Sequence, residues 1–171
     1  MKILETKRLT LRQVALDDGE FVLELLNEPL FIQNIGDRGV RTLEDARNYI
    51  SDRIISSYEN LGFGMYLVTL KYTGAAAGLC GLVKRNGLND VDIGYAFLSR
   101  YWSKGYATEA ALAVKEHAKN TIGIKRLVAI TDPANQGSVR VLEKIGLKFE
   151  KMIRLSEDDI ELKLYGTNFL G

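Results

Sequence analysis

Hydrophobic positions near the start of the chain follow first a strand period and then a helix period. Residues 8–14, RLTLRQV, alternate between the two faces of an extended chain, which predicts a strand. Asp17 and Glu20 then form a capping signal for a helix, and apolar residues continue at helical spacing through Leu26. The chain is therefore expected to open with a strand that leads into a helix.

A second helix is predicted from Thr42 to Gly62. Thr42 and Asp45 repeat the capping signal, and Gly62 is the residue type that most often ends a helix. The apolar residues that recur at helical spacing between them are Leu43, Ala46, Ile50, Ile54 and Tyr58. The segment between the two helices contains Pro29 and is predicted to form a turn.

Three strands are predicted to follow the second helix. Residues 63–72, 76–84 and 91–98 are rich in aromatic residues, Val and Leu, which favour extended structure. Gly74 separates the first two strands, and the turn-forming segment RNGLND, residues 85–90, separates the second from the third. Because such short connections join neighbouring antiparallel strands, the three strands should form a meander.

The C-terminal half alternates helices with strands. A helix is predicted from Ala107 to Gly123, and the small apolar residues on the face that would pack against a sheet are Ala110, Ala111, Val114 and Ala118. The remaining predicted elements are a strand at 125–131, a helix at 135–145 closed by Gly146, and strands at 147–154 and 160–165. This order predicts an α+β fold, with mixed α/β layers around one sheet.

The composition fits one domain that spans residues 1–171. The 171 residues are 46% hydrophobic and 26% charged, which is enough apolar material for a single core. The formal net charge of +1 provides no general attraction to nucleic acid or to a membrane surface. No segment has the roughly 20 apolar residues of a transmembrane helix, and the first residues lack the apolar block of a signal peptide, so a cytoplasmic protein is expected.

Cys80 and His117 are the only residues of their types in the chain. They cannot form an internal disulfide or provide the ligand spacing of a zinc site, so no metal is expected. Cys80 stands between apolar residues of a predicted strand and is interpreted as a core residue. His117 is expected on the polar side of its helix, in contact with solvent.

The segment YWSKGYATEA, residues 101–110, joins the meander to the long helix. The start of a helix has unpaired N–H groups and the positive end of the helix dipole, so it binds anions. Gly105 and Ala107 leave room for close approach, Lys104 adds charge and the Thr108 hydroxyl can donate a hydrogen bond. The spacing is not that of a nucleotide P-loop. A phosphate cradle and a plain strand-to-helix turn both fit this segment.

Three segments together resemble the GNAT acetyltransferase superfamily. WSKGYA resembles its pyrophosphate loop, Q/R-x-x-G-x-G/A, with Trp102 in place of the usual Gln or Arg. Within DIGYAFLSRYWSKGYATEA, this replacement is similar to the RimJ/RimL branch of ribosomal-protein alpha-amino acetyltransferases. DPANQGSVRVLEKIGLKFE resembles N-x-x-S-x-x-x-L-E-K-x-G-F, with Asn135 and Ser138 in place and Leu147 where Phe is usual. ETKRLTLRQVALDD resembles the opening strand and capped helix of the branch.

The resemblance implies the GNAT acyl-CoA N-acyltransferase fold, in which a largely antiparallel sheet is flanked by helices and contains a parallel strand pair that splays apart. It implies direct transfer from acetyl-CoA to a primary amine, either a protein N-terminal alpha-amine or a small amine, in a ternary complex. Pantetheine would pair with the backbone of Phe97 and Leu98. The residues implied to bind the diphosphate are Ser103, Lys104, Gly105, Tyr106, Ala107 and Thr108, and those along the pantetheine arm are Asn135 and Ser138.

The resemblance also implies candidate catalytic groups. The amide of Ala96 is the oxyanion donor by position. Leu142 stands where the superfamily commonly has a Tyr acid, so Ser138 is the candidate acid, and a binding or helix-capping serine is the alternative. Asp92 stands where related enzymes often have Glu and is the candidate base, with a solvated carboxylate as the alternative. An alpha-amine, with a pKa of about 7.7 to 8.0, needs only mild help from a base.

Acceptor contacts and assembly stay open at this point. Asp37, Arg38 and Arg41 lie where the family keeps acceptor contacts, and the acidic turn 157–159 faces either a cationic acceptor or solvent. Trp102 is expected either to cover the donor or to pack the loop. Two functions fit: an N-acetyltransferase, and a non-catalytic acyl-CoA-binding regulator that kept the fold without the usual Tyr. A monomer and a homodimer both fit the sequence.

Overall fold

The computed structural model describes residues 1–169, which form one sheet of eight strands in the order β1-β2-β3-β4-β5-β6-β8-β7. Every neighbouring pair is antiparallel except β5 and β6. The strands are β1 (Lys2–Glu5), β2 (Leu9–Gln13), β3 (Met65–Leu70), β4 (Ala76–Val83), β5 (Val91–Phe97), β6 (Arg126–Thr131), β7 (Lys148–Ile153) and β8 (Leu162–Asn168). The predicted α+β fold and the meander of β3, β4 and β5 are confirmed.

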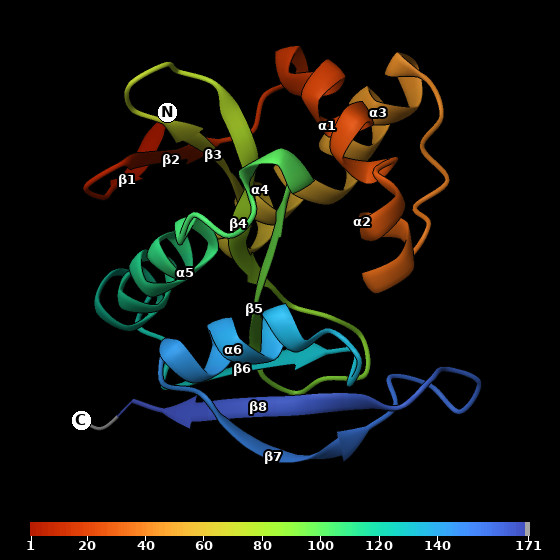
Figure 1. Ribbon diagram of the computed structural model, residues 1–171, viewed down its shortest axis with the longest axis vertical. Coiled ribbons are helices and arrows are strands. Elements are labelled where there is room, and N and C mark those ends of the chain that lie inside the picture. Colours follow the sequence, from red (N-terminus) through yellow and green to blue (C-terminus); the bar gives the residue numbers. More distant parts are fainter. Residues whose placement is uncertain (170–171) are drawn as a thin grey trace.

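Helices lie on both sides of the sheet (Figure 1). They are α1 (Gly19–Leu26), α2 (Pro29–Asn34), α3 (Leu43–Tyr49), α4 (Ser56–Leu61), α5 (Tyr106–His117) and α6 (Gln136–Lys144). A π-helical segment, Ile50–Ile55, joins α3 to α4, and Gly62 ends this long helix in the left-handed conformation, as predicted. No helix among residues 1–169 is long and apolar enough to cross a membrane.

Three N-terminal expectations need correction. Pro29 does not lie in a turn, because it is the first residue of α2, where its fixed φ and missing N–H suit a helix start. The capping carboxylate before α1 belongs to Asp18 and not to Asp17, since Asp18 accepts from the Ala15 amide at 2.8 Å and pairs with Arg12 at 2.8 Å. Strand β1 was not predicted. It pairs with β2 in an antiparallel ladder.

Two hydrophobic cores lie on the two faces of the sheet. One packs α1 and the α3–α4 helix against the strands and includes Leu25, Ile50 and Leu79. The other packs α5 and α6 against the opposite face. The small residues that were predicted to face the sheet are all fully buried in this second core: Ala110, Ala111 and Val114 in α5, and Ala118 in the π-helical segment Ala118–Ile122 that continues it. The sheet is therefore held between two helical layers.

Cys80 lies in the interior, and His117 is partly buried. Cys80 is fully buried in the core, as predicted. His117 is not the solvated residue that was expected, because its ring meets the ring of Tyr66 edge-on with 6.1 Å between the ring centres. Burial lowers the pKa of His117. Its side chain therefore contributes to packing at the end of α5.

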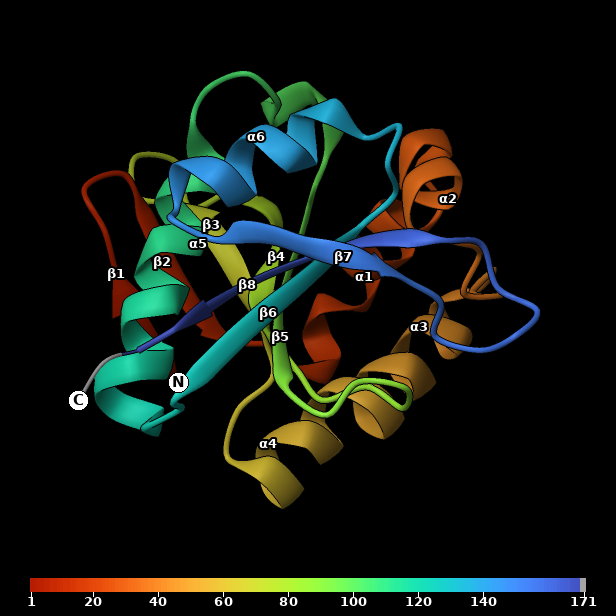
Figure 2. The ribbon, with the colours of Figure 1, turned by 90° about the horizontal axis from the view of Figure 1, so that it is seen from below.

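β5 and β6 are parallel partners over only two residue pairs, Val91 with Leu127 and Asp92 with Val128. Beyond Asp92, β5 stays paired with β4 as far as Phe97, while β6 stays paired with β8. The two strands run in clearly different directions in Figure 1, and Figure 2 shows them close together at their beginnings. Within the described residues, one edge of β5 thus has no strand partner from 93 to 97, which confirms the predicted splayed pair.

Candidate active site

Two cavities meet beside the unpaired edge of β5. The loop-side cavity, of about 310 Å³, is lined by α2, β5, α6 and the loop before α5. The turn-side cavity, of about 590 Å³, is lined by α2, β5, β6 and the turn before β8. The residues that line both are Asn34, Ile35, Tyr95, Asn135 and Ser138. Molecules bound in the two cavities can therefore meet at these side chains.

The loop-side cavity reaches the start of α5. Ser103 and Gly105 have left-handed backbone conformations, with φ of 62° and 84°, in a loop whose amides can face one concavity. Ser103 is the only non-glycine residue with a positive φ within residues 1–169, so the loop is held in a conformation that side chains disfavour. Gly105 is the N-cap residue of α5, and no side chain in the described part of the chain caps this end. The first amides of α5 are available to an anion.

Arg8 and Glu109 tie this loop to the N-terminal part of the sheet. Arg8 Nε donates to Glu109 Oε1 at 2.7 Å, and Arg8 Nη1 donates to the Lys104 carbonyl at 2.9 Å. Glu109 also accepts from the Arg8 amide at 2.9 Å and from the Thr6 hydroxyl at 2.5 Å. The Arg8 guanidinium stands over the Tyr106 ring, 4.6 Å from its centre. Sequence reasoning missed this network because Arg8 and Glu109 are 101 positions apart.

Most residues implied to bind the donor line the loop-side cavity, namely Phe97, Ser103, Gly105, Tyr106, Ala107, Thr108, Asn135 and Ser138. Leu98 and Lys104 are not part of its wall. Leu98 is fully buried and its amide donates to the Ala77 carbonyl at 3.0 Å, so this amide is not free to pair with a ligand. Trp102 Nε1 donates to the Phe97 carbonyl at 2.8 Å, so Trp102 packs the loop while it also lines the cavity.

The direction of the main-chain amides along β5 corrects the function predicted for Ala96. Because the Leu98 amide donates to β4, the alternation of an antiparallel ladder directs the Ala96 amide toward β4 as well. The amides of Tyr95 and Phe97 point instead to the edge from which β6 has diverged. Ala96 lines the loop-side cavity, but its amide is not available to an oxyanion there.

Tyr95 and Ser138 face each other where the cavities meet. The Tyr95 hydroxyl lies 2.8 Å from Ser138 Oγ and donates to the Ser138 carbonyl at 3.1 Å. The Ser138 amide donates to the Asn135 side chain at 3.2 Å, which caps α6. Burial raises the pKa of Tyr95, so its phenol stays protonated at neutral pH. Leu142 is buried in the core, so the phenol at this site comes from β5 and not from α6.

Asp92 is buried and paired, in contrast to the solvated alternative. Its side chain is 1% exposed and pairs with Arg85 Nε at 3.0 Å, and both residues line the turn-side cavity. Burial raises the pKa of Asp92, although the charge of Arg85 opposes this shift. A carboxylate with a raised pKa takes up a proton more readily near neutral pH than an ordinary aspartate, which suits a base.

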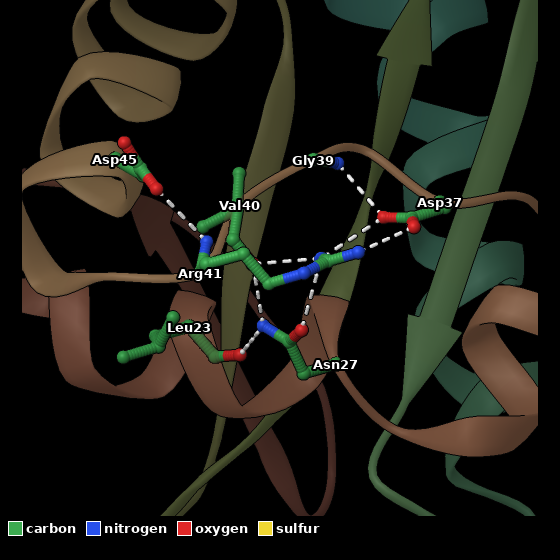
Figure 3. A network of polar contacts seen from close by, with 7 residues as sticks. All are labelled: Leu23, Asn27, Asp37, Gly39, Val40, Arg41 and Asp45. Atoms are coloured by element: carbon green, nitrogen blue, oxygen red, sulfur yellow. Dashed lines mark hydrogen bonds and ion pairs between the residues drawn. The ribbon is translucent and has the colours of Figure 1, made fainter.

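The loop between α2 and α3 is shaped by its own polar network (Figure 3). Arg41 pairs with Asp37 at 2.5 Å and donates to Asn27 Oδ1 at 3.3 Å, while Asn27 Nδ2 donates to the Val40 carbonyl at 2.8 Å. Asp37 and Arg41 are therefore used within the loop. Of the three charged residues predicted to contact the acceptor, Arg38 is the one that lines the turn-side cavity.

Carboxylates outnumber unpaired cations in the wall of the turn-side cavity. Asp132, Asp158 and Asp159 line it, against Arg38 and an Arg85 that is already paired with Asp92. Two residues of the predicted acidic turn thus reach the cavity. Asp132 follows β6 directly and was not singled out from the sequence. The charges of this wall favour a cationic occupant.

The sheet with one diverging parallel pair, and the helix start at the end of its opening, define an enzyme that uses an acyl-CoA donor. The pattern of the acetyltransferase (GNAT) domain matches residues 8–148. The chain therefore belongs to the GNAT acetyltransferase family and is an acetyl-CoA-dependent N-acetyltransferase.

Two relatives in Bacillus subtilis strain 168 and one solved structure are similar to this chain. The uncharacterized N-acetyltransferase YnaD is 31% identical over 147 residues, which are 86% of this chain and 83% of YnaD. The uncharacterized protein YkkB is 39% identical over 95 residues, 54% of this chain and only 55% of YkkB. RimL, the ribosomal L7/L12 alpha-N-protein acetyltransferase in complex with coenzyme A, has a TM-score of 0.85 at 20% identity, with 98% of each chain covered. RimL therefore shares the fold.

Proposed function

We propose that this protein transfers the acetyl group of acetyl-CoA directly to a cationic primary amine, either the alpha-amine of a protein N-terminus or a small amine. The observation that carries the proposal is that two cavities meet at Tyr95 and Ser138, beside β5 amides that have no strand partner. One cavity suits the donor and the other suits the acceptor. Both substrates can thus be bound at once.

The loop-side cavity binds the donor in this proposal. Extended pantetheine takes the place of a strand beside β5, since the amides of Tyr95 and Phe97 face the opening. The diphosphate binds the amides at the start of α5, where the helix dipole favours negative charge and Gly105 has no side chain in the way. RimL, which has the same fold, is known in complex with coenzyme A.

The turn-side cavity binds the acceptor. Its carboxylates, Asp132, Asp158 and Asp159, attract a cationic amine more strongly than a neutral one. The alpha-amine of a protein is such a group, and it is the substrate class named for RimL. The low pKa of alpha-amines, about 7.7 to 8.0, leaves a useful fraction unprotonated near neutral pH. The charge of the wall favours any cationic amine, including a small polyamine, and the low pKa favours a protein N-terminus in particular.

Three groups act on the reaction. The amine nitrogen bonds to the thioester carbonyl carbon, and the Tyr95 amide donates to the carbonyl oxygen as negative charge develops there. The C–S bond then breaks with its electron pair on sulfur, and the Ser138 hydroxyl donates to that thiolate. Asp92 receives the amine proton. It lies three residues from Tyr95, about 10 Å along a strand, so this proton crosses through water.

Release of free coenzyme A from acetyl-CoA, measured with a panel of amines, tests the proposal. The panel contains short peptides with free N-termini and the same peptides with a blocked N-terminus and an internal lysine. It also contains spermidine and a hydroxylated amine that is uncharged at the pH of the assay. We expect turnover with at least one cationic amine. We also expect Ser138→Ala to lower kcat more than it weakens coenzyme A binding, because the hydroxyl acts on the leaving group. Binding of coenzyme A without acetylation of any amine would contradict the proposed function.

A further inference from the structure

The Ser138 hydroxyl has one proton, and two oxygen neighbours compete for the hydrogen bonds around it. Tyr95 Oη lies 2.8 Å from Ser138 Oγ, and either atom can be the donor. The same Tyr95 hydroxyl lies 3.1 Å from the Ser138 carbonyl oxygen. Two hydroxyl protons are thus shared among three oxygens. Which way they point decides whether the Ser138 proton is free to face the loop-side cavity.

We propose that Tyr95 is a positioning residue that directs the Ser138 hydroxyl to the sulfur of the leaving coenzyme A. The inference rests on the function proposed above for Ser138. Tyr95 lines both cavities from β5, and Ser138 lines both from α6, so the pair stands where donor and acceptor meet. The Tyr95 hydroxyl forms a hydrogen bond with Ser138 Oγ, and the Ser138 amide donates to the Asn135 side chain.

Two arrangements of the protons fit the observed distances. In the first, Tyr95 donates to the Ser138 carbonyl and Ser138 donates to Tyr95 Oη, so the Ser138 proton is used within the pair. In the second, Tyr95 donates to Ser138 Oγ, and the Ser138 proton is free to point at the sulfur. A thiolate is a charged acceptor and forms a stronger hydrogen bond than a neutral phenol oxygen. Formation of the thiolate therefore favours the second arrangement.

The change between the arrangements leaves no buried group without a partner. The Ser138 carbonyl lies inside α6, where the helix provides it with the amide of residue 142. When Tyr95 turns its proton to Ser138 Oγ, this carbonyl keeps its helical hydrogen bond. The hydrogen bonds of the Tyr95 hydroxyl are both to oxygens of Ser138, so this hydroxyl is engaged within the pair in either arrangement. Tyr95 thus orients Ser138 and is not itself the acid.

Tyr95→Phe, alone and combined with Ser138→Ala, tests this inference. Acetyl-CoA is the donor, and the acceptor is the fastest amine of the panel described above. We expect Tyr95→Phe to lower kcat about tenfold and to leave the KM for acetyl-CoA within about twofold, because only the orientation of one hydrogen bond is lost. In the Ser138→Ala background, the same substitution should change kcat by less than about twofold, since no hydroxyl remains to be oriented.

Tyr58→Phe is the matched control. Tyr58 lies outside the walls of both cavities, and its hydroxyl also takes part in two hydrogen bonds, with the Val14 amide at 3.0 Å and with the Met65 carbonyl. We expect kcat of the folded Tyr58→Phe protein to equal that of the parent. Coenzyme A binding by calorimetry confirms that each variant keeps a folded donor site.

The outcomes separate the inference from the proposed function. An equal loss of kcat from Tyr95→Phe in both backgrounds would show that Tyr95 does not act through Ser138. A raised KM with unchanged kcat would make Tyr95 a binding or packing residue. Either result overturns the inference while Ser138→Ala still slows the parent. If Ser138→Ala leaves kcat unchanged, the proposed function of Ser138 fails first and the inference fails with it.

Discussion

Burial of the Asp92 carboxyl group affects both its protonation and the stability of the folded protein. Its side chain is almost completely buried, and it forms an ion pair with Arg85 at 3.0 Å. Burial raises the pKa of Asp92, so the folded protein binds this proton more tightly than the unfolded chain does. The free energy of unfolding therefore falls as the pH rises through the folded-state pKa of Asp92, because the buried carboxyl group then loses its proton. The proton transfer proposed for Asp92 would account for such a cost.

Replacement of this carboxyl by an amide tests its function. We expect Asp92→Asn to lower kcat/KM near pH 7 by about 100-fold, because the amide cannot accept the proton of the amine. The acidic limb of the pH profile that belongs to Asp92 should disappear at the same time. Thermal unfolding near pH 7 should show no loss of stability, because the neutral side chain avoids the burial of a charge. Steady-state kinetics across pH and calorimetry check these outcomes.

Asp90→Asn is the control for this substitution. Asp90 lies two residues earlier, outside both cavity walls, and also pairs with an arginine, Arg126, at 3.2 Å. Its loss should leave kcat/KM unchanged. A folded Asp92→Asn protein that keeps the parent kcat would show that Asp92 serves only to pair with Arg85.

For single residues, the sequence predicted the positions that line the site more accurately than the function of each residue there. Ser138, Asn135 and most of the loop line the cavity, as the motif implied. The predicted oxyanion donor, the Ala96 amide, is one position away from the Tyr95 amide that faces the opening. The sequence does not show which amides of β5 point to β4, because this depends on how the two strands pair. Tyr95 was not singled out from the sequence, because its contact with α6 arises only in the folded chain.

Among the elements, the start of α5 depends on a residue from the other end of the chain. Glu109, in the first turn of α5, accepts three hydrogen bonds from Thr6 and Arg8. Arg8 then holds the Lys104 carbonyl in the loop before the helix. The network keeps the amides of the loop in place before any ligand arrives. This preorganisation lowers the entropic cost of binding an anion.

Glu109→Gln should weaken coenzyme A binding about fivefold, since part of the charge-assisted network, worth about 1 kcal/mol at this partly exposed position, is lost. Titration calorimetry with coenzyme A measures this change. Glu116→Gln is the control on the same helix, because within residues 1–169 the Glu116 side chain accepts a hydrogen bond only from the nearby side chain of Asn120, at 3.2 Å. Similar affinities for Glu109→Gln and the parent would show that the loop keeps its shape without this carboxylate.

The elements themselves were mostly readable from the sequence, because caps and periodicity are local signals. The capping box of Thr42 and Asp45 forms at the start of α3, and Gly62 ends the long helix that begins there. α2 was missed because it is only six residues long and begins at a proline that was taken for a turn. This omission mattered for the site, since Asn34 and Ile35 at the end of α2 line both cavities. Pro29 at a helix start was the signal that could have revealed it.

For the whole molecule, ligand binding and folding stability should be coupled through the start of α5. Gly105 and Gly123 both have φ of 84°, so alanine at either position costs about 1 to 2 kcal/mol of strain. Only at Gly105 would the new methyl group meet a neighbour, Arg8 Nη2 at 3.2 Å, whereas at Gly123 it meets nothing within 4 Å. The two substitutions therefore match in backbone strain and differ in their distance from the donor site.

Coenzyme A at about 100 times its Kd should raise the Tm of the parent by about 5 to 10 °C. We expect Gly123→Ala to lower the Tm without ligand but to keep this rise. Gly105→Ala should lower the Tm and lose most of the rise. Differential scanning calorimetry with and without coenzyme A measures all three proteins. An equal rise in both variants would place the anion elsewhere than the start of α5.

The overall architecture was predictable because the family resemblance covered three well-separated segments. Both the splayed strands and the two helical layers agree with it. The acceptor side was harder to predict. Its wall combines α2, β6 and the turn before β8, and Asp132 gave no local signal that it would lie near Asp158 and Asp159. Short loops from distant parts of the chain therefore decide the charge of the turn-side cavity.

Only two residue pairs join β5 to β6, and in the proposed complex the acetyl-CoA donor takes the place of the missing strand pairing. Enzyme occupied by acetyl-CoA resists unfolding, and hence degradation, better than empty enzyme does. We therefore expect the supply of acetyl-CoA to change how long the enzyme persists, with faster clearance when acetyl-CoA is scarce.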